Sequence, residues 1–327
     1  MYNLIIIKMK INFYCENLLN KQYVEYDIKH IGYSEDSFVY HLQHLSNPQK
    51  QIIVKCFKDE IISKELDVNK KLLHKDNFIL SGLIQPLNIS IYDLTRYIKT
   101  NICVIEYPYY KYDLDSYIKK NLKISFSNKL KLIKQIKNGI EYLHSIGYYH
   151  GDLKPQNICI SENGDELKII DYGLCDQIDN KNTEYYWKNT VYSASPFQIF
   201  HRLQDYPDYV KKYYDKYYTI INTKYNPTKN ENFQRCKYQT TFKESCVKND
   251  WFGVGLLIYF ILTDGKYFFL SSNLNHIIKN DVISDDALEE IIKNSYDFLD
   301  NPIEYCKSIK IKHSEYYEKY ILQLVES

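Results

Sequence analysis

Short runs of β-branched and aromatic residues alternate with turn signals in the first third of the chain. Residues 38–40 and 52–54 form two such runs within the segment 24–58, and they predict strands. Ser46, Asn47 and Pro48 between them predict a turn. Residues 59–73 carry Ile62, Leu66 and Leu73 loosely on one face, which predicts a helix. The apolar segment 101–107 then predicts another strand.

The rest of the chain is dominated by helical periodicity. Residues 127–144 predict a long helix that begins at the N-cap Ser127 and ends before Gly147. Two short strands, 158–160 and 167–170, follow with the turn 162–165 between them. The segment 254–262 is apolar on all sides, which predicts a helix buried in the core. The change from strand-rich to helix-rich sequence near Pro108 predicts a domain boundary there.

Composition narrows the class of protein. The 327 residues include 42 Lys and Arg and 41 Asp and Glu, a net charge of +1 that argues against nucleic acid or an anionic membrane as the main partner. None of the eight cysteines forms a C-x-x-C pair, and scattered single cysteines fit a reducing compartment. The apolar run near the N-terminus is too short for a signal sequence, and the longest apolar segment is about half a membrane span. These features predict a soluble, intracellular, cytoplasmic protein with no membrane partner.

The most informative segment is 150–157, which reads H-G-D-L-K-P-Q-N, followed by D-Y-G at 171–173. Asp152 and Lys154 are two residues apart, so in an extended loop they point to the same side. The hairpin after Asn157 returns the chain so that Asp171 can lie near it. Amide and carboxylate oxygens suit Mg²⁺, which favours the company of phosphate. One Asp is then left to accept a hydroxyl proton, while the Lys can neutralise charge on a phosphoryl group.

This segment resembles the catalytic loop H-R-D-L-K-x-x-N and the D-F-G motif of the eukaryotic-type protein kinases. The resemblance implies that Asp152 is the catalytic base and that Lys154 steadies the γ-phosphate of ATP. It also implies that Asn157 and Asp171 hold Mg²⁺. Thr190 resembles the threonine that in Ser/Thr kinases bonds the catalytic Asp and Lys.

Further motifs extend the resemblance from about residue 31 to residue 269. The segment 53–55 resembles the strand whose lysine contacts the α- and β-phosphates, and Glu65 stands where the partner of that lysine belongs. Only two residues of the segment 32–39 match the phosphate-covering loop G-x-G-x-x-G-x-V. Residues 105–108 resemble the hinge that reads adenine, and 250–255 resemble D-x-W-S-x-G at the start of the central helix. The residues that the resemblance assigns to nucleotide binding are Gly32, Val39, Ile53, Lys55, Glu65, Glu106, Tyr107, Asn157, Cys159 and Asp171.

Several positions depart from the family pattern. Gly151 replaces the Arg that pairs with a phosphorylated activation segment. Phe197 in the segment A-S-P-F replaces the Glu of A-P-E. Ile53 replaces a small Ala beside the adenine, and Asn69 is polar where the family usually has an apolar residue.

Residues 198–248 form an insert that is longer than the family usually has there. The insert holds ten Lys and Arg against five Asp and Glu, a net of +5. It therefore admits two interpretations. One is a basic docking segment for a substrate or nucleic acid. The favoured one is an amphipathic helix that packs an aromatic face on the protein, because apolar residues recur at helical spacing; they are Tyr206, Val210, Tyr213, Tyr217 and Ile221.

The sequence therefore predicts an α+β, bilobal protein kinase-like fold. A strand-rich, nucleotide-binding N-lobe occupies 20–107, and a helical C-lobe with the insert occupies 108–327. The implied activity is transfer of the γ-phosphoryl group of ATP, with Mg²⁺, to Ser or Thr of a protein substrate. Two alternatives stay open. One is a pseudokinase scaffold, favoured by the missing glycines and by Gly151 and Phe197. The other is a small-molecule phosphotransferase of the aminoglycoside or choline kinase type, which shares H-G-D-x-x-x-x-N.

Overall fold

The computed structural model describes residues 14–33, 37–58, 63–73, 82–93, 101–120, 123–178, 190–203, 207–220, 238–270, 278–279 and 282–308. The chain divides into two compact units, residues 1–111 and 112–327. The lobe boundaries inferred from the sequence, 20–107 and 108–327, stay predictions.

Unit 1 is built on a five-stranded antiparallel sheet in the order β1-β2-β3-β5-β4. The strand pair β2 and β3 is joined by the predicted turn, where Lys50 N donates to Asn47 O at 2.9 Å. The strands and the turn expected from the apolar runs are therefore confirmed. The strands are β1 (Tyr26–Tyr33), β2 (Ser37–His44), β3 (Gln51–Lys58), β4 (Asn88–Asp93) and β5 (Asn101–Pro108).

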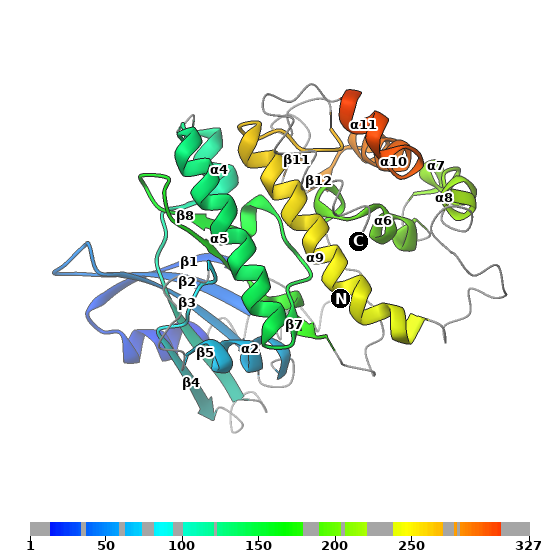
Figure 1. Ribbon diagram of the computed structural model, residues 1–327. Coiled ribbons are helices and arrows are strands. Elements are labelled where there is room, and N and C mark those ends of the chain that lie inside the picture. The colour runs from blue at the N-terminus through cyan, green and yellow to red at the C-terminus, as the bar shows by residue number, and fades with distance from the viewer. Residues whose placement is uncertain are drawn as a thin grey trace. The chain divides into compact units, whose positions relative to one another are not determined.

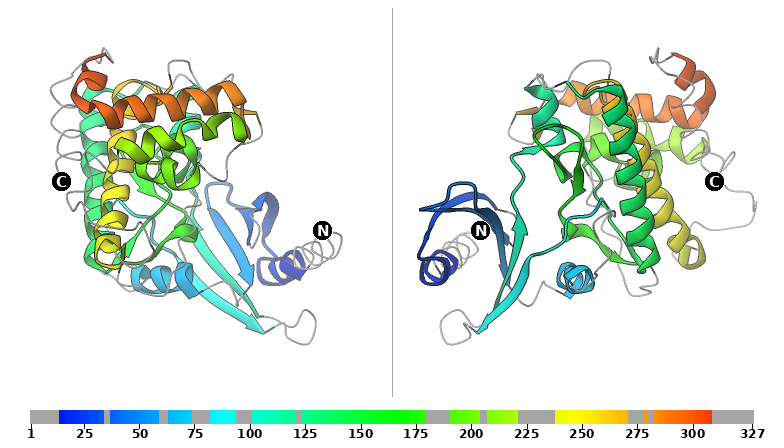
Figure 2. Two further views of the ribbon diagram at one scale, coloured as in Figure 1. Left: turned by 90° about the vertical axis from the view of Figure 1, so that its right-hand side faces the viewer. Right: turned by 60° about the vertical axis from the view of Figure 1, so that its left-hand side comes forward.

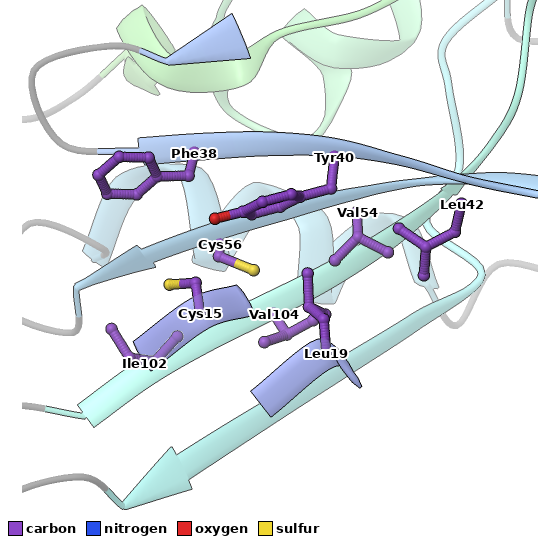
Figure 3. Close-up of a cluster of buried hydrophobic side chains, with 9 residues drawn as sticks. All are labelled: Cys15, Leu19, Phe38, Tyr40, Leu42, Val54, Cys56, Ile102 and Val104. Atoms are coloured by element: carbon purple, nitrogen blue, oxygen red, sulfur yellow. The ribbon is translucent and has the colours of Figure 1, made fainter. Parts of the chain in front are cut away.

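One face of this sheet is covered by a helix over residues 14–22. Side chains at alternate positions of the central strands point to this face, as the period of a strand requires. Cys15 and Leu19 of the helix are fully buried against Tyr40 of β2 and Val54 of β3 (Figure 3). Burial of each such side chain stabilises the unit by about 1.5–3 kcal/mol. The helix lies outside the strands that the sequence predicted, and it completes the core of unit 1.

The second helix of unit 1 that the structure describes in full is α2 (Ser63–Leu73). Its buried residues include Leu66, Val68 and Leu72, so the expected helix is confirmed over this range. Residues 59–62, where the sequence placed the beginning of this helix, lie outside the described residues.

Unit 2 is mainly helical. Its two long helices, α5 (Phe126–Ser145) and α9 (Tyr238–Leu262), run side by side (Figure 1). Its short strands form the three-stranded sheet β6-β8-β9 and the pairs β7-β10 and β11-β12. They are β6 (Tyr112–Asp113), β7 (Tyr148–Tyr149), β8 (Ile158–Ile160), β9 (Leu167–Ile169), β10 (Asp176–Gln177), β11 (Ile278–Lys279) and β12 (Val282–Ile283).

Short helical elements complete the described part of unit 2. They are α4 (Leu114–Lys119), η3 (Pro155–Asn157), η4 (Tyr172–Leu174), η5 (Val191–Ser193), α6 (Pro196–Arg202), α7 (Asp208–Lys211), α8 (Tyr214–Ile220), α10 (Asp285–Asp300) and α11 (Pro302–Ser308). Among the helices of the described ranges, none combines the length and the apolar character needed to cross a bilayer.

The N-cap of α5 is Ser125, so the prediction of Ser127 was wrong. The backbone of Ser125 is extended, and its Oγ accepts a hydrogen bond from Asn128 N at 3.2 Å. A cap needs this non-helical backbone, and Ser127 is already inside the helix. At the other end Gly147 has a φ of +87°, the left-handed conformation in which a glycine follows a helix without strain. The predicted end of the helix is therefore confirmed.

The apolar segment 254–262 forms the C-terminal part of α9 and is buried along its whole length, as predicted. The helix itself begins much earlier, at Tyr238. Its first half is rich in polar residues such as Lys243, Glu244 and Lys248. This part of the sequence therefore shows no apolar periodicity from which a helix could be predicted.

The described part of the insert packs its aromatic face on unit 2. Val210 and Tyr217 are fully buried and Tyr213 is nearly so, and Tyr217 Oη donates to Ile292 O of α10 at 2.9 Å. Figure 2 shows α6 and α8 lying against α10. The packing interpretation therefore holds here, although two short helices replace the single one expected. Tyr206 and Ile221 lie outside the described residues.

Candidate active site

Candidate nucleotide-binding residues of unit 1 share one face of its sheet. Gly32 of β1 pairs with Val39 of β2, and Val39 pairs with Lys55 of β3. Residues directly opposite each other in antiparallel strands project to the same face. Ile53, two residues before Lys55, points to this face as well and pairs with Tyr107 of β5. This face is the opposite of the one that the helix 14–22 covers.

The structure brings Lys55 and Glu65 together on this face. Lys55 Nζ lies 2.8 Å from Glu65 Oε1 and 2.9 Å from Oε2, and both side chains are mostly buried, with 14% and 13% of their surface exposed. Glu65 is in the first turn of α2, where a carboxylate is favoured by the helix dipole. An ammonium held by two carboxylate oxygens has its position fixed.

Glu106 and Tyr107, in the segment predicted as the hinge, form hydrogen bonds to other residues of unit 1. Glu106 Oε1 accepts from Asn88 Nδ2 at 2.7 Å, and the Glu106 carbonyl oxygen accepts from Leu87 N at 2.7 Å. The Glu106 carbonyl is thus already an acceptor within the sheet. Tyr107 is buried, and its hydroxyl donates to Asn69 Oδ1 at 3.0 Å. A role of either residue in reading adenine stays a prediction.

Unit 2 brings Asp152, Lys154 and Thr190 into one hydrogen-bonded triangle. Lys154 Nζ lies 2.7 Å from Asp152 Oδ2 and donates to Thr190 Oγ1 at 3.1 Å. Thr190 Oγ1 in turn donates to Asp152 Oδ1 at 3.4 Å. The expectation that Thr190 bonds both residues is therefore confirmed. Asp152 is buried, and a buried carboxylate is stable only with such partners.

The loop that carries Asp152 is held by a second acid, Asp250 of α9. Its Oδ2 accepts from His150 N at 2.7 Å, and its Oδ1 accepts from Gly151 N at 2.9 Å. His144 Nε2 also lies 2.9 Å from Oδ2. Asp250 is only 2% exposed, so these donors compensate a buried charge. The D-x-W-like pattern marked Asp250 in the sequence without revealing this role, and no sequence signal indicated His144.

His150 adds a further brace to the same loop. Its Nδ1 accepts from Asp152 N at 3.2 Å, and its Nε2 lies 3.1 Å from the carbonyl oxygen of Ile170. A carbonyl oxygen only accepts, so the ring carries its proton on Nε2. The side chain therefore links the residue before Asp171 to the backbone of Asp152.

One predicted metal ligand, Asn157, is bonded through its backbone to the residue that precedes the other, Asp171. Ile170 N donates to Asn157 O at 2.9 Å, which brings Asp171 next to Asn157 as the hairpin argument expected. Asn157 Nδ2 donates to Asp152 O at 2.8 Å and to Asp152 Oδ2 at 3.0 Å, so Oδ1 is the amide atom suited to bind a cation. Asp171 has an exposed side chain and a φ of +66°, a left-handed backbone that an Asp can adopt.

This donor set fits Mg²⁺ rather than a metal held in an all-protein cage. In the described ranges no group of three or more His, Cys, Asp and Glu residues is arranged to hold a metal ion. Magnesium usually takes one or two protein oxygens and fills its other positions with water and phosphate. An amide oxygen of Asn157 with the carboxylate of Asp171 meets that requirement.

Cys159 follows Asn157 on β8 and is half-buried. Burial, and next the carboxylate of Asp113 on the paired strand, raise the pKa of its thiol to about 12. The residue is therefore a neutral, weakly polar surface and not a nucleophile. The six other cysteines in the part of the chain that the structure describes are buried free thiols.

Two of the departures from the family pattern are visible in unit 2. Gly151 has a φ of +78°, and a Cβ at this position would lie 2.9 Å from Leu174 O. Ser195, in the segment that replaces A-P-E, caps α6 in a reciprocal capping box with Gln198. Nothing is described of the Phe197 side chain or of residues 179–189.

Comparison with known proteins agrees with this architecture. The chain is 28% identical over 168 residues to a probable casein kinase II subunit alpha homolog of Encephalitozoon cuniculi, covering 49% of this chain and 46% of that protein. It is 33% identical over 158 residues to the mitogen-activated protein kinase hog1 of Botryotinia fuckeliana, covering 46% of this chain and 39% of that protein. The chain thus spans less than half the length of the curated relatives it matches.

Among solved structures, the yeast RNA Pol II CTD kinase CTDK-1 complex contains a chain of the same fold. The match has a TM-score of 0.50 and 20% identity, and it covers 84% of this chain and 67% of that one. The predicted α+β, bilobal protein kinase-like fold is confirmed. The model of the protein kinase domain family matches residues 26–205, more than half of the chain. The chain belongs to the protein kinase family.

Proposed function

We propose that this chain is an ATP-dependent protein kinase that phosphorylates Ser or Thr of a protein substrate. The observation that carries the proposal is the triangle of Asp152, Lys154 and Thr190. It combines a proton acceptor, a cation and a hydroxyl that holds both in place. A chain that had lost phosphoryl transfer would have no need to keep all three groups in this geometry.

In the proposed reaction the acceptor hydroxyl oxygen attacks the γ-phosphorus of ATP. The bond from phosphorus to the bridging oxygen breaks, ADP leaves, and the hydroxyl proton passes to Asp152. Lys154 offsets charge on the phosphoryl oxygens as the bonds change. Asn157 holds the Asp152 carboxylate through Nδ2, so the base is oriented before the substrate arrives.

The groups of unit 1 have the complementary role of holding ATP. Lys55 is proposed to contact the α- and β-phosphates, and its ammonium group is positioned by Glu65. Asn157 and Asp171 would hold Mg²⁺, which would neutralise part of the charge of the phosphates. Both assignments rest on the match of these residues to the motifs of the family.

The choice of Ser or Thr over Tyr rests on Lys154. Tyrosine kinases of the family usually carry A-A-x or R-A-A after D-L, whereas this chain has Lys154, Pro155 and Gln156. The bond from Lys154 to Thr190 fits the Ser/Thr pattern. The family match also favours a protein substrate over an amino alcohol or a sugar.

The test is a substrate panel for the purified protein with ATP and Mg²⁺. The panel contains basic proteins with Ser and Thr, Tyr-containing peptides, amino alcohols and aminoglycosides, and the product is identified as phosphoserine, phosphothreonine or phosphotyrosine. The Asp152→Ala variant is expected to lose transfer while it still binds ATP in calorimetry. Absence of any metal-dependent turnover would support the pseudokinase instead, and transfer only to small molecules would support the phosphotransferase. If Asp152→Ala loses ATP binding together with transfer, the role given to Asp152 is wrong.

A further inference from the structure

A buried amide lies in the middle of α2, surrounded by apolar side chains. Asn69 is fully buried, and its neighbours Leu66, Val68 and Leu72 are buried as well. Removing an amide from water is costly unless its polar atoms find hydrogen-bond partners. A buried amide is therefore stable in a core only when its polar atoms form hydrogen bonds.

Both polar atoms of Asn69 are bonded. Nδ2 donates to Glu65 O at 2.8 Å, one helical turn back, and Oδ1 accepts from the Tyr107 hydroxyl at 3.0 Å. Tyr107 is on β5, 38 residues further along the chain, and only 8% exposed. The Asn69 amide therefore joins α2 to β5 through Tyr107. It also bonds the backbone carbonyl of Glu65, the residue that pairs with Lys55.

Two side-chain connections join α2 to the sheet: the Tyr107–Asn69 hydrogen bond and the Lys55–Glu65 ion pair. Glu65 and Asn69 are four residues apart, so they share one face of the helix. On the sheet, Lys55 pairs with Ile105, and Tyr107 is two residues beyond Ile105 on the same face. Both connections therefore join one face of α2 to one face of the sheet.

A third hydrogen bond holds the C-terminal end of α2. Gln85 Nε2 donates to the carbonyl oxygen of Leu72 at 3.0 Å. Carbonyls in the last turn of a helix lack partners within the helix, so this bond holds the C-terminal end of α2. The helix is thus bonded at its first turn, its middle and its end.

We propose that Asn69 is a positioning residue for phosphoryl transfer, which acts with Tyr107 as a strut that holds Glu65 against Lys55. The proposal rests on the proposed function for its effect on activity, although the geometry can be tested without turnover. An apolar contact at this position would be non-directional and would let the helix slide or rotate. A hydrogen bond is directional, so it selects one orientation of α2. The strut lies wholly within unit 1 and needs no phosphate on the activation segment.

The first experiment measures how fast an amine-directed reagent acetylates Lys55, followed by mass spectrometry of the peptide. Acetylation requires Lys55 Nζ to leave both carboxylate oxygens, so the rate reports how often the pair is open. The exposed Lys29 on β1 serves as an internal reference, and Glu65→Gln sets the rate for a broken pair. The variants are Tyr107→Phe, which removes one hydroxyl, and Asn69→Leu, which supplies the apolar residue usual in the family. Asp67→Asn, at an exposed position of α2, is the control.

Each strut variant is expected to raise the Lys55 rate relative to Lys29 by about fivefold to tenfold, the usual effect of one lost buried hydrogen bond. The double variant should be no faster than the faster single variant, because each single variant already lacks the bond between Tyr107 and Asn69. The control should stay within about twofold of wild type. If the enzyme is active, kcat should fall by a similar factor in both single variants while the KM for the protein substrate stays unchanged.

Two results would overturn the proposal. One is a Lys55 rate within about twofold of wild type in both single variants while Glu65→Gln raises it. The other is a double variant whose effect is the product of the two single effects, which would mean that the residues act independently. Because acetylation needs no ATP turnover, a protein without kinase activity would still support or refute the strut.

Discussion

Gly151 holds the loop before Asp152 in a conformation that a side chain would strain. Its φ is +78°, and an added Cβ would meet Leu174 O at 2.9 Å, closer than real Cβ atoms come to a backbone oxygen. The left-handed conformation costs a residue with a Cβ about 1–2 kcal/mol. The contact adds to this cost, because the backbone around Leu174 must shift to relieve it.

We therefore expect Gly151→Ala to destabilise unit 2. Alanine lowers the entropy of the unfolded chain, which offsets about 0.4–1 kcal/mol of the cost. A net loss of about 1–2 kcal/mol remains, and for a unit of this size it lowers the Tm by roughly 2–8 °C. Gly151 N also donates to Asp250 Oδ1 at 2.9 Å, so a shift here displaces Asp152 and should lower kcat.

Scanning calorimetry of wild type and variant measures the change in Tm. Gly32→Ala is the matched control, because Gly32 has no positive φ and none of the described residues has an atom within 4 Å of an added Cβ there. That control should leave the Tm unchanged or raise it slightly. An equal or higher Tm for Gly151→Ala would refute the strain argument. The same strain applies to Gly151→Arg, so restoring the Arg of the family is expected to destabilise the loop as well.

Four further predictions concern the site. Asp171→Asn should abolish Mg²⁺-dependent turnover without changing the Tm, and turnover within about tenfold of wild type would refute the metal assignment. Thr190→Val should lower kcat more than the KM for ATP in steady-state kinetics, because it removes a donor to Asp152 and an acceptor for Lys154; an unchanged kcat would contradict this role. Complete dephosphorylation, verified by mass, should lower activity by less than about tenfold, because Gly151 offers no charge to a phosphate on the activation segment; a larger fall would mean that another basic residue replaces the missing Arg. Because burial raises the pKa of Cys159 to about 12, its alkylation rate should still rise tenfold per unit between pH 8 and 10, and levelling near pH 9 would contradict this pKa.

The sequence predicted those parts of the protein that depend on neighbours along the chain. The strands β2 and β3 follow from runs of β-branched and aromatic residues, the helix α5 from the helical period of its apolar residues, and the buried part of α9 from its continuous apolar run. Asp152, Lys154 and Asn157 lie within six residues of each other, so a loop and one turn bring them together whatever surrounds them. For the same reason the hairpin after Asn157 was enough to predict that Asp171 returns beside it.

Tertiary structure decided the features that join distant residues. Ser125 and Ser127 both lie near the beginning of α5, and only the backbone conformation shows that Ser125 is the cap. Asp250 holds a loop 100 residues away, and Asn69 meets Tyr107 across 38 residues. In each case the sequence shows a polar residue without indicating which of many distant donors it faces. Periodicity reports which residues are buried, whereas the partner of a buried polar group depends on the packing of elements, which no local pattern encodes.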